Sequence, residues 1–308
     1  MENFKYSNSN KRYHTLDYFY KNKFNSKVCK VSLNAGFSCP HLDSGGCIYC
    51  SKTGSGEFGG DINDDLITQF NSVRKRLSNK WNNCKYIGYF QARTNTLAPV
   101  NVLKEKYETI LNLENVVGLS IATRPDSISN ECLDYLEELN KKTYLTIELG
   151  LQTIHNQTSI LINRKHSLDC FYNMVKKLRE RNIDVVVHII NGLPYETKEM
   201  MIETVKYLNK LDIQGIKIHM LSILKDTKLE ELYNKKPFKL LTIDEYIEIV
   251  CEQLTHLNEK IVIHRLTGDP IESDLIAPLW ITKKINVLNG IDKYMAKNNL
   301  YQGIRIVK

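Results

Sequence analysis

The sequence has no long apolar stretch. No run of about 18 or more apolar residues occurs in its 308 residues, so neither a membrane-spanning helix nor a membrane partner is predicted. The first five residues are polar and lack the apolar core of a secretory signal, so we expect a cytoplasmic protein. No low-complexity or linker-like segment interrupts the chain, and 42% apolar with 25% charged residues is typical of a globular domain.

Disulfides are also not expected. Eight cysteines in a chain that we place in the cytoplasm are predicted to remain thiols. Isolated thiols of this kind are most often small buried apolar residues. The isolated cysteines are Cys29, Cys84, Cys132, Cys170 and Cys251. The remaining three fall within twelve residues of one another, and the sequence contains no second cluster.

The clustered cysteines are Cys39, Cys47 and Cys50, separated by seven and by two residues. A closed structural zinc site needs four ligands, so three thiols leave one coordination position open. An iron–sulfur cube held by three thiolates has one iron that is free to bind another molecule. Zinc with His41 as a fourth ligand is the alternative, although this spacing lies outside the common zinc patterns.

The net charge of +7 is concentrated at the two ends of the chain. Residues 1–30 carry seven Lys/Arg against two Asp/Glu, and residues 283–308 carry six against one. Aromatic residues alternate with the bases in residues 1–26. Such a segment could bind a polyanion such as RNA, with rings stacking on unpaired bases. The alternative is a solvated lysine-rich surface whose rings pack on the body of the protein.

The body of the chain alternates between strand and helix patterns. Six β-branched or apolar strands are each followed by a helix with apolar residues at intervals of three or four. The expected strands are residues 27–33, 86–90, 116–122, 144–149, 184–190 and 215–221. This alternation predicts a parallel sheet with right-handed crossovers. After a connection at 222–241, Thr242 and Glu245 form a capping box that opens a helix, and residues 260–266 suggest one more strand.

Polar residues follow nearly every expected strand. In parallel βα folds the carboxyl ends of the strands form the site of chemistry, so these side chains should converge. Besides the cysteines, the segments are 91–96, 123–126, Glu148 with Gln152, 191–194, His219 with Ser222, and 264–265.

Taken together, these segments resemble the radical S-adenosylmethionine (SAM) superfamily, in the branch of the elongator catalytic subunit and its bacterial relatives. The resemblance covers residues 27–270 and rests on the cysteine segment with five further motifs. The motifs are residues 86–92, 122–126, 148–152, 162–166 and 188–194. The commonest spacing in the superfamily places three residues between the first two cysteines, whereas seven stand here, as in the longer loops of this branch. The large acetyltransferase domain of the elongator subunit is not expected in this chain.

The resemblance implies a (β/α)6 partial TIM barrel with short terminal extensions. We expect a basic, aromatic arm at 1–26, the core at 27–270 and a helical extension at 271–308. It also implies that Cys39, Cys47 and Cys50 hold a [4Fe–4S] cluster whose open iron binds SAM. An external flavodoxin- or ferredoxin-type donor would supply the electron that cleaves SAM to a 5′-deoxyadenosyl radical.

The remaining cofactor contacts are also implied by the resemblance. Tyr49 would lie against the adenine, with Gly192 and the backbone of Leu221 beside it; Gly192 could equally serve a turn before Pro194. The SAM ammonium needs acceptor oxygens, which Gln91, Thr94 and Asn95 would supply.

Two charged residues have both a cofactor role and a structural alternative. Glu148 needs hydrogen-bond partners in its apolar strand, and the ribose hydroxyls would provide them, with Gln152 nearby. Arg164 would clamp the SAM carboxylate, or else pair with Glu148 in a salt bridge.

Arg124, Asp126 and His219 are the candidates to face substrate. The Arg-Pro-Asp corner could instead be a self-paired turn, and His219 could be a satisfied core histidine like His188. His264, Arg265 and Asp269 are further candidates on the last strand.

The branch and the basic ends together predict modification of tRNA, at the side chain of a wobble uridine. A small-molecule or cofactor precursor as substrate is the first alternative. A metal-binding, RNA-associated protein without radical chemistry is the second. The absence of a second cysteine cluster disfavours sulfur insertion and glycyl-radical activation.

Overall fold

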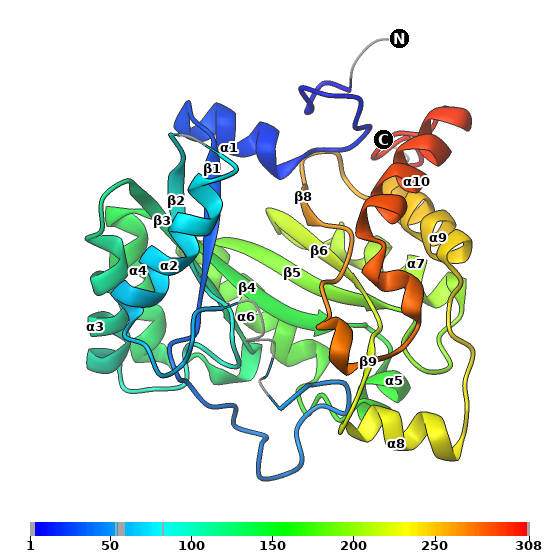
Figure 1. Cartoon of the computed structure of the whole chain (residues 1–308), viewed down its shortest axis with the longest axis horizontal. Helices are drawn as coiled ribbons and strands as arrows, with labels where there is room; N and C mark the ends of the chain where they lie inside the picture. The colour runs from blue at the N-terminus through cyan, green and yellow to red at the C-terminus, as the bar shows by residue number, and fades with distance from the viewer. Residues whose placement is uncertain (1–3, 53, 55–58, 82, 307–308) are drawn as a thin grey trace.

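A curled parallel sheet of seven strands forms the centre of the computed structural model, which describes residues 4–306 except 53, 55–58 and 82 (Figure 1). The strand order is β1-β2-β3-β4-β5-β6-β8, and every neighbouring pair is parallel. The strands are β1 (Val28–Leu33), β2 (Lys85–Phe90), β3 (Val116–Thr123), β4 (Tyr144–Gln152), β5 (Asp184–Asn191), β6 (Gly215–Met220) and β8 (Val262–Arg265). All their carboxyl ends therefore lie at one edge, as the sequence predicts.

Helices cover the outer face of this sheet and fill the connections. They are α1 (Leu16–Phe24), α2 (Leu66–Ser78), α3 (Val100–Leu111), α4 (Asn130–Lys142), α5 (Asn156–Leu161), α6 (Leu168–Glu180), α7 (Lys198–Leu208), α8 (Lys228–Lys235), α9 (Ile243–His256) and α10 (Lys284–Lys297). Short polar side chains cap the N-termini of several of these helices. Ser167 and Thr197 accept hydrogen bonds from Cys170 and Met200, which satisfies backbone donors in the first turns of α6 and α7.

The predicted fold class is confirmed, and the sheet has one strand more than the six βα repeats supply. The expected seventh strand is present as β8, paired with β6 in the register Gly215 to Val262. The connection at 222–241, which carried no predicted element, contains α8 and the short strand β7 (Ile223–Leu224). β7 pairs antiparallel with β9 (Leu275–Ala277).

The N-terminal segment closes the edge where the strands begin. The Ile263 N–H donates to the His14 carbonyl at 2.8 Å, and Thr15 forms a parallel bridge with the same residue of β8. α1 then crosses toward β1, where Tyr20 is buried against Val28 and Ile87. The rings of this segment thus pack on the body of the protein, as the alternative reading of the arm expected.

The C-terminal segment packs beside the N-terminal one (Figure 1). The Gln302 N–H donates to the Arg12 carbonyl at 2.9 Å, and the Gln302 side chain donates to the carbonyls of Asn258 and Ile261. Within the part of the chain that the structure describes, no helix is long and apolar enough to cross a membrane.

Candidate active site

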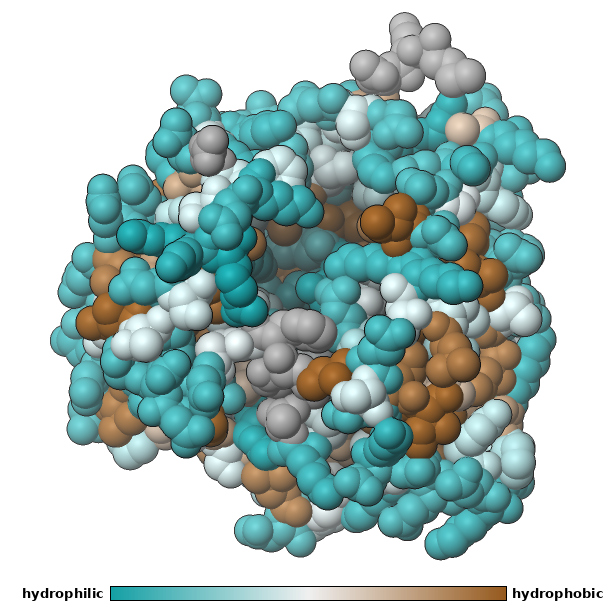
Figure 2. All heavy atoms as spheres, in the orientation of Figure 1, coloured by the Kyte–Doolittle hydropathy of each residue, from teal (hydrophilic) through white to brown (hydrophobic). Residues whose placement is uncertain are grey.

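A cavity of about 340 Å³ opens at the carboxyl edge of the sheet. Figure 2 shows this hollow near the centre of the face in view. Its walls come from the cysteine loop and from the ends of β2, β3, β4, β5, β6 and β8. The polar groups that follow the strands therefore meet in one cavity, as the parallel topology requires.

The three clustered cysteines all line this cavity, and all three are free thiols. Backbone contacts hold their loop in place: the Ile48 N–H donates to the Ile162 carbonyl at 3.1 Å, and the Ile48 carbonyl accepts from Leu229 at 2.9 Å. Among the described residues, no three His, Cys, Asp or Glu side chains lie close enough together to hold a metal ion as they stand.

His41 does not complete a zinc site with these thiols. Its Nε2 lies 3.2 Å from Asp126 Oδ2, so the ring is engaged with a carboxylate outside the cysteine set. The zinc alternative therefore finds no support in the geometry.

Arg124 and Asp126 bind each other and brace the cysteine loop. Two parallel hydrogen bonds of 2.9 and 2.8 Å join the guanidinium to the carboxylate. Arg124 also donates to the Arg164 carbonyl at 2.7 Å and approaches Cys47 Sγ at 3.9 Å. These bonds are those of the self-paired turn given as the alternative. Arg124 lines the cavity beside a thiol, and a substrate role for the pair stays a prediction.

This arrangement changes two pKa values. A hydrogen bond from Cys50 and the charge of Arg124 lower the pKa of Cys47 to about 6, against the opposing effect of burial. Burial alone would raise the pKa of Asp126, but its bonds to Arg124 lower that pKa to about 2. One of the three thiols is therefore poised to ionise, and a thiolate is the form that binds metal.

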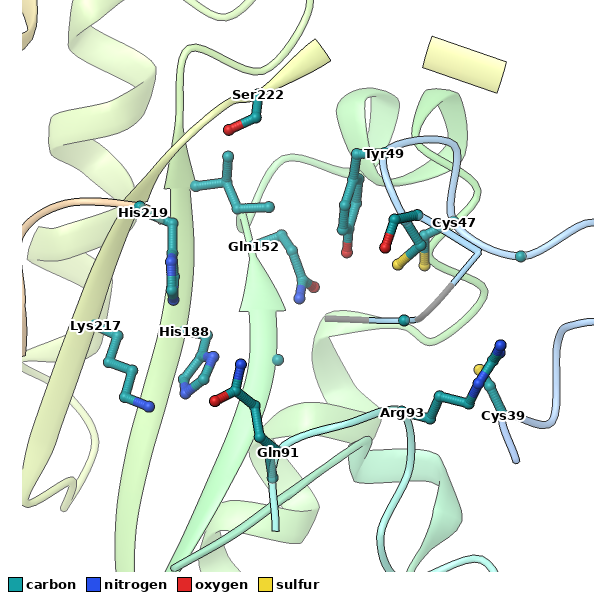
Figure 3. A pocket seen from close by; sticks show the side chains of 18 of the residues that line it. Cys39, Cys47, Tyr49, Gln91, Arg93, Gln152, His188, Lys217, His219 and Ser222 are labelled. Atoms are coloured by element: carbon teal, nitrogen blue, oxygen red, sulfur yellow. The ribbon is translucent and has the colours of Figure 1, made fainter. Parts of the chain in front are cut away.

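Several predicted cofactor contacts do line the cavity. Figure 3 shows Gln91 and Gln152 between the cysteines on one side and His188 on the other. Gln152 sits in a left-handed backbone conformation at a register shift in the pairing of β4 with β5. Its Oε1 is buried and has no partner among the described residues. Lining the same cavity are Tyr49, Thr94 and Leu221.

Arg164 is turned away from the cavity. The residue is 2% exposed, and its guanidinium donates to the backbone carbonyls of Leu151, Thr153 and His166 at 2.6 to 3.2 Å. No salt bridge joins Arg164 to Glu148, so that alternative is wrong, and the SAM-carboxylate role finds no support in this geometry. Arg164 instead ties the end of β4 to the segment after α5.

Asn95 and Gly192 also lie outside the lining of this cavity. Asn95 Nδ2 donates to three carbonyls, of Phe90, Ala92 and Ala122, and so fixes the loop after β2 rather than facing a ligand. Gly192, with φ of 84°, lies beside a second, much smaller pocket where Leu241 covers it. Its turn role is supported, and its approach to the adenine stays a prediction that this position does not favour.

Glu148 lies at the floor of the cavity, fully buried, and accepts four hydrogen bonds. Its Oε1 accepts from Lys30 and Ser120, both at 2.6 Å. Its Oε2 accepts from Lys217 and lies 2.7 Å from His188 Nε2. Protein groups thus take the places that the ribose hydroxyls were expected to fill.

The floor contains residues that the sequence interpretation missed. Lys217 donates to the Tyr89 hydroxyl at 2.9 Å as well as to Glu148, and Lys30 reaches the same carboxylate from β1. The sequence did contain a signal for them: Lys30 and Lys217 each stand in the middle of a largely apolar strand, β1 and β6 respectively. His219 lines the cavity as expected, with its ring 5.2 Å from that of His188 and a buried Nε2 that has no partner among the described residues.

The floor groups shift one another's pKa values. Burial opposes ionisation of Glu148, yet the charges of Lys217 and Lys30 hold its pKa well below the usual range. Burial lowers the pKa of Lys217 to about 7, and burial with the Lys217 charge lowers the pKa of His188 to about 4. The pKa of His219 is lowered well below its usual range, first by burial and then by His188.

Comparison with known proteins agrees with this architecture. The profile of the Radical SAM superfamily matches residues 38–208, which is more than half of the chain, and that of the Radical_SAM C-terminal domain matches residues 213–297. The chain belongs to the radical SAM superfamily. It is 50% identical to YtqA of Bacillus subtilis over 97% of this chain and 94% of that protein. It is 30% identical to YhcC of Escherichia coli over 90% of both.

The chain is also similar, at lower identity, to proteins of the elongator branch. The solved structure of Elp3 from the archaeon Methanocaldococcus infernus superposes with a TM-score of 0.70 at 20% identity, covering 90% of this chain and 64% of that one. A tRNA uridine(34) acetyltransferase of the same organism is 26% identical over 60% of this chain and 34% of its own length. The radical SAM chain described here therefore shares the fold of Elp3 and spans only part of such longer proteins.

The residues present fit the groups that this superfamily implies. Three free thiols line one cavity, one of them with a lowered pKa, and the buried Oε1 of Gln152 faces the same space. Thiolates are the usual protein ligands of iron–sulfur clusters, and an amide oxygen can accept from an ammonium group.

Proposed function

We propose that this radical SAM enzyme holds a [4Fe–4S] cluster on Cys39, Cys47 and Cys50 and binds SAM in the adjoining cavity to modify tRNA. The modified position would be the side chain of a wobble uridine. The observation that carries the cluster assignment is the placement of three free thiols on one cavity wall.

When bound, the cluster and SAM supply a one-electron cleavage that yields methionine and a 5′-deoxyadenosyl radical able to abstract hydrogen. The chain's own groups prepare the space for this chemistry. Arg124 favours the thiolate of Cys47, and Asp126 holds the guanidinium in place. Gln91, Thr94 and Gln152 are available to hold the SAM ammonium, and Tyr49 with the Leu221 backbone to hold the adenine. An external flavodoxin- or ferredoxin-type protein would deliver the electron.

The tRNA assignment rests on similarity to the tRNA uridine(34) acetyltransferase and on the net positive charge. A small-molecule substrate is the second candidate, and pairing of the terminal lysines favours it. Lys5 contacts Glu259, and Lys11 contacts Asp292, so part of the basic charge at the ends is already neutralised by this chain.

Reconstitution with iron and sulfide under anaerobic conditions tests the cluster. The wild type should bind about four irons per chain and form 5′-deoxyadenosine from SAM once reduced. Cys47→Ala should lose both properties, because a thiolate ligand is removed. Cys170→Ala, a thiol on α6 away from the cavity, is the matched control and should retain them. A colourless wild-type protein with bound zinc would instead indicate a metal-binding protein without radical chemistry.

Mass spectrometry of tRNA nucleosides tests the substrate. A strain that lacks the gene should lose one modified uridine, and Cys47→Ala expressed in that strain should not restore it. An unchanged nucleoside profile, together with SAM cleavage by the purified enzyme, would redirect the search to small molecules.

A further inference from the structure

The cavity has two chemically different ends. The cysteines lie on one side, and Lys217, His188 and His219 lie on the other, with Gln91 and Gln152 between them (Figure 3). A cofactor held at the cysteines therefore leaves the opposite end, the floor, to the molecule that reacts. What the floor can bind follows from its charges and its unused hydrogen-bond donors.

The floor holds two amino groups for one carboxylate. Lys30 and Lys217 share the single carboxylate of Glu148. The nearby Arg265, which also lines the cavity, contacts Asp269 at 3.1 Å, and Lys284 shares that carboxylate at 2.8 Å. The lowered histidine pKa values keep those rings neutral near pH 7. Glu148 can therefore neutralise only one of the two ammonium groups. Burial lowers the pKa of Lys217 to about 7, so near that pH the second ammonium is half formed, and an anion bound beside it would favour its protonated state.

Glu148 is also saturated as an acceptor. Four donors already contact its two oxygens, so it presents little negative charge to the cavity. Lys217 has three N–H donors, of which Glu148 and the Tyr89 hydroxyl take two. In its protonated form Lys217 thus has one donor left for a ligand, and an incoming anion would stabilise that form.

His219 adds a second, neutral group at the same place. The side chain faces the cavity (Figure 3). Its Nε2 is buried and forms no hydrogen bond with any described residue. A buried polar nitrogen without a partner costs free energy that a ligand oxygen would recover, provided that the proton is on Nε2. Lys217 and His219 stand two residues apart on β6 and therefore project to the same face of the strand.

We propose that the floor of the cavity binds a compact oxyanion, a carboxylate or a phosphate of the reacting molecule, through Lys217 and His219. The inference rests on the proposed function in one respect only, that the cysteine end of the cavity is occupied by the cofactor. It narrows the substrate to a molecule, or a co-substrate, with an acidic group close to the position that loses hydrogen. A substrate that is neutral throughout would leave Lys217 without an anionic partner and therefore partly deprotonated near pH 7.

Equilibrium dialysis with radiolabelled acetate and with inorganic phosphate tests this assignment. The wild type should bind one anion per chain. Lys217→Met should bind it about tenfold to a hundredfold more weakly, because a charged hydrogen bond is lost. This variant leaves Lys30 paired one-to-one with Glu148, so the floor stays neutral and should fold. Lys176→Met, on the exposed face of α6, is the control and should bind like the wild type.

His219→Leu provides a second variant that changes no formal charge. It should lower the affinity for the anion by about tenfold. Binding of acetate alone identifies a carboxylate, binding of phosphate alone identifies a phosphate, and binding of both supports a general oxyanion site. The proposal is overturned if the wild type binds neither anion, or if both variants bind them as tightly as the wild type.

The measurement is made on the reconstituted enzyme and on the protein as purified, with iron content and 5′-deoxyadenosine formation recorded for each. If a variant loses anion binding but keeps its iron, the loss is due to the substitution at the floor and not to loss of the cluster. A wild type that lacks the cluster but binds an anion through Lys217 would refute the proposed function and leave the anion site standing.

Discussion

Glu148 can remain ionised in the barrel interior because four donors surround it. Burying a carboxylate without such partners costs several kcal/mol, on the order of the whole stability of many domains. From the sequence, an acidic residue within an apolar strand was enough to predict that partners must exist. Their identity depended on the register of β1 and β6 against β4, which the sequence does not specify.

His188 should make stability depend on pH. Burial and the Lys217 charge lower its pKa in the folded protein from 6.5 to about 4, so between these values only the unfolded chain binds the proton. Stability contributed by the neutral ring is therefore present above pH 6.5 and declines as the pH falls toward 4. His188→Gln keeps a donor for Glu148 but cannot titrate, so its urea-unfolding free energy should fall less steeply over this interval. Equal slopes for wild type and variant would contradict the assignment.

The predicted site residues divide according to side-chain direction. The motifs correctly indicate which residue follows which strand, and the cysteines, Gln91 and Gln152 do reach the cavity. Arg164 and Asn95 follow the right elements but turn toward backbone carbonyls. Sequence order fixes position along the chain, whereas the direction of a loop side chain depends on which carbonyls the tertiary fold leaves unsatisfied.

At the scale of elements, α9 shows how a local signal can determine a helix end. Thr242 Oγ1 accepts from the Glu245 N–H at 3.2 Å, and Glu245 Oε2 accepts from the Thr242 N–H at 2.9 Å. This is the capping box that the sequence predicts. It satisfies two backbone donors that the first turn would otherwise leave without partners.

Thr242→Ala should lower the free energy of unfolding by about 1 kcal/mol, because the cap oxygen is removed. The same substitution at Thr109, in the last turn of α3 and away from any N-cap, is the matched control. Alanine has the higher helix propensity, so Thr109→Ala should be neutral or slightly stabilising. Urea denaturation of the three proteins measures the difference. A Thr242→Ala variant as stable as wild type would show that the N-terminus of α9 does not depend on its cap.

The elements that the sequence missed are short or irregular. α8 has eight residues with only Leu229 buried, and β7 has two residues, too few to establish a helical or alternating pattern. The long apolar strands of the sheet and the amphipathic helices between them were predicted, because burial of one face repeats along their whole length, whereas the nine-residue α1 and the six-residue α5 were not. Short elements depend instead on tertiary contacts, such as the pairing of β7 with β9.

At the scale of the whole molecule, the basic terminal segments and the cavity lie at opposite edges of the sheet. The segments around α1 and the end of α10, which carry most of the basic excess, pack where the strands begin, and the cysteine loop lies where the strands end (Figure 1). A tRNA whose base enters the cavity would thus contact a different surface from the terminal lysines. Exposed bases that border the cavity segments are Lys52, Lys165, Lys225 and Lys228.

These two sets of lysines give a test of how tRNA would bind. The affinity of wild type should fall with salt, and the slope of log K against log salt should flatten by about one unit for each phosphate contact removed. Changing the four cavity-border lysines to Gln should flatten that slope. Changing Lys5, Lys11, Lys21 and Lys23 to Gln should leave it nearly unchanged, because those residues lie near the opposite edge of the sheet (Figure 1). Filter binding over a salt series measures both. The reverse pattern would place the nucleic acid on the terminal segments, and no binding by wild type at low salt would exclude tRNA as the substrate.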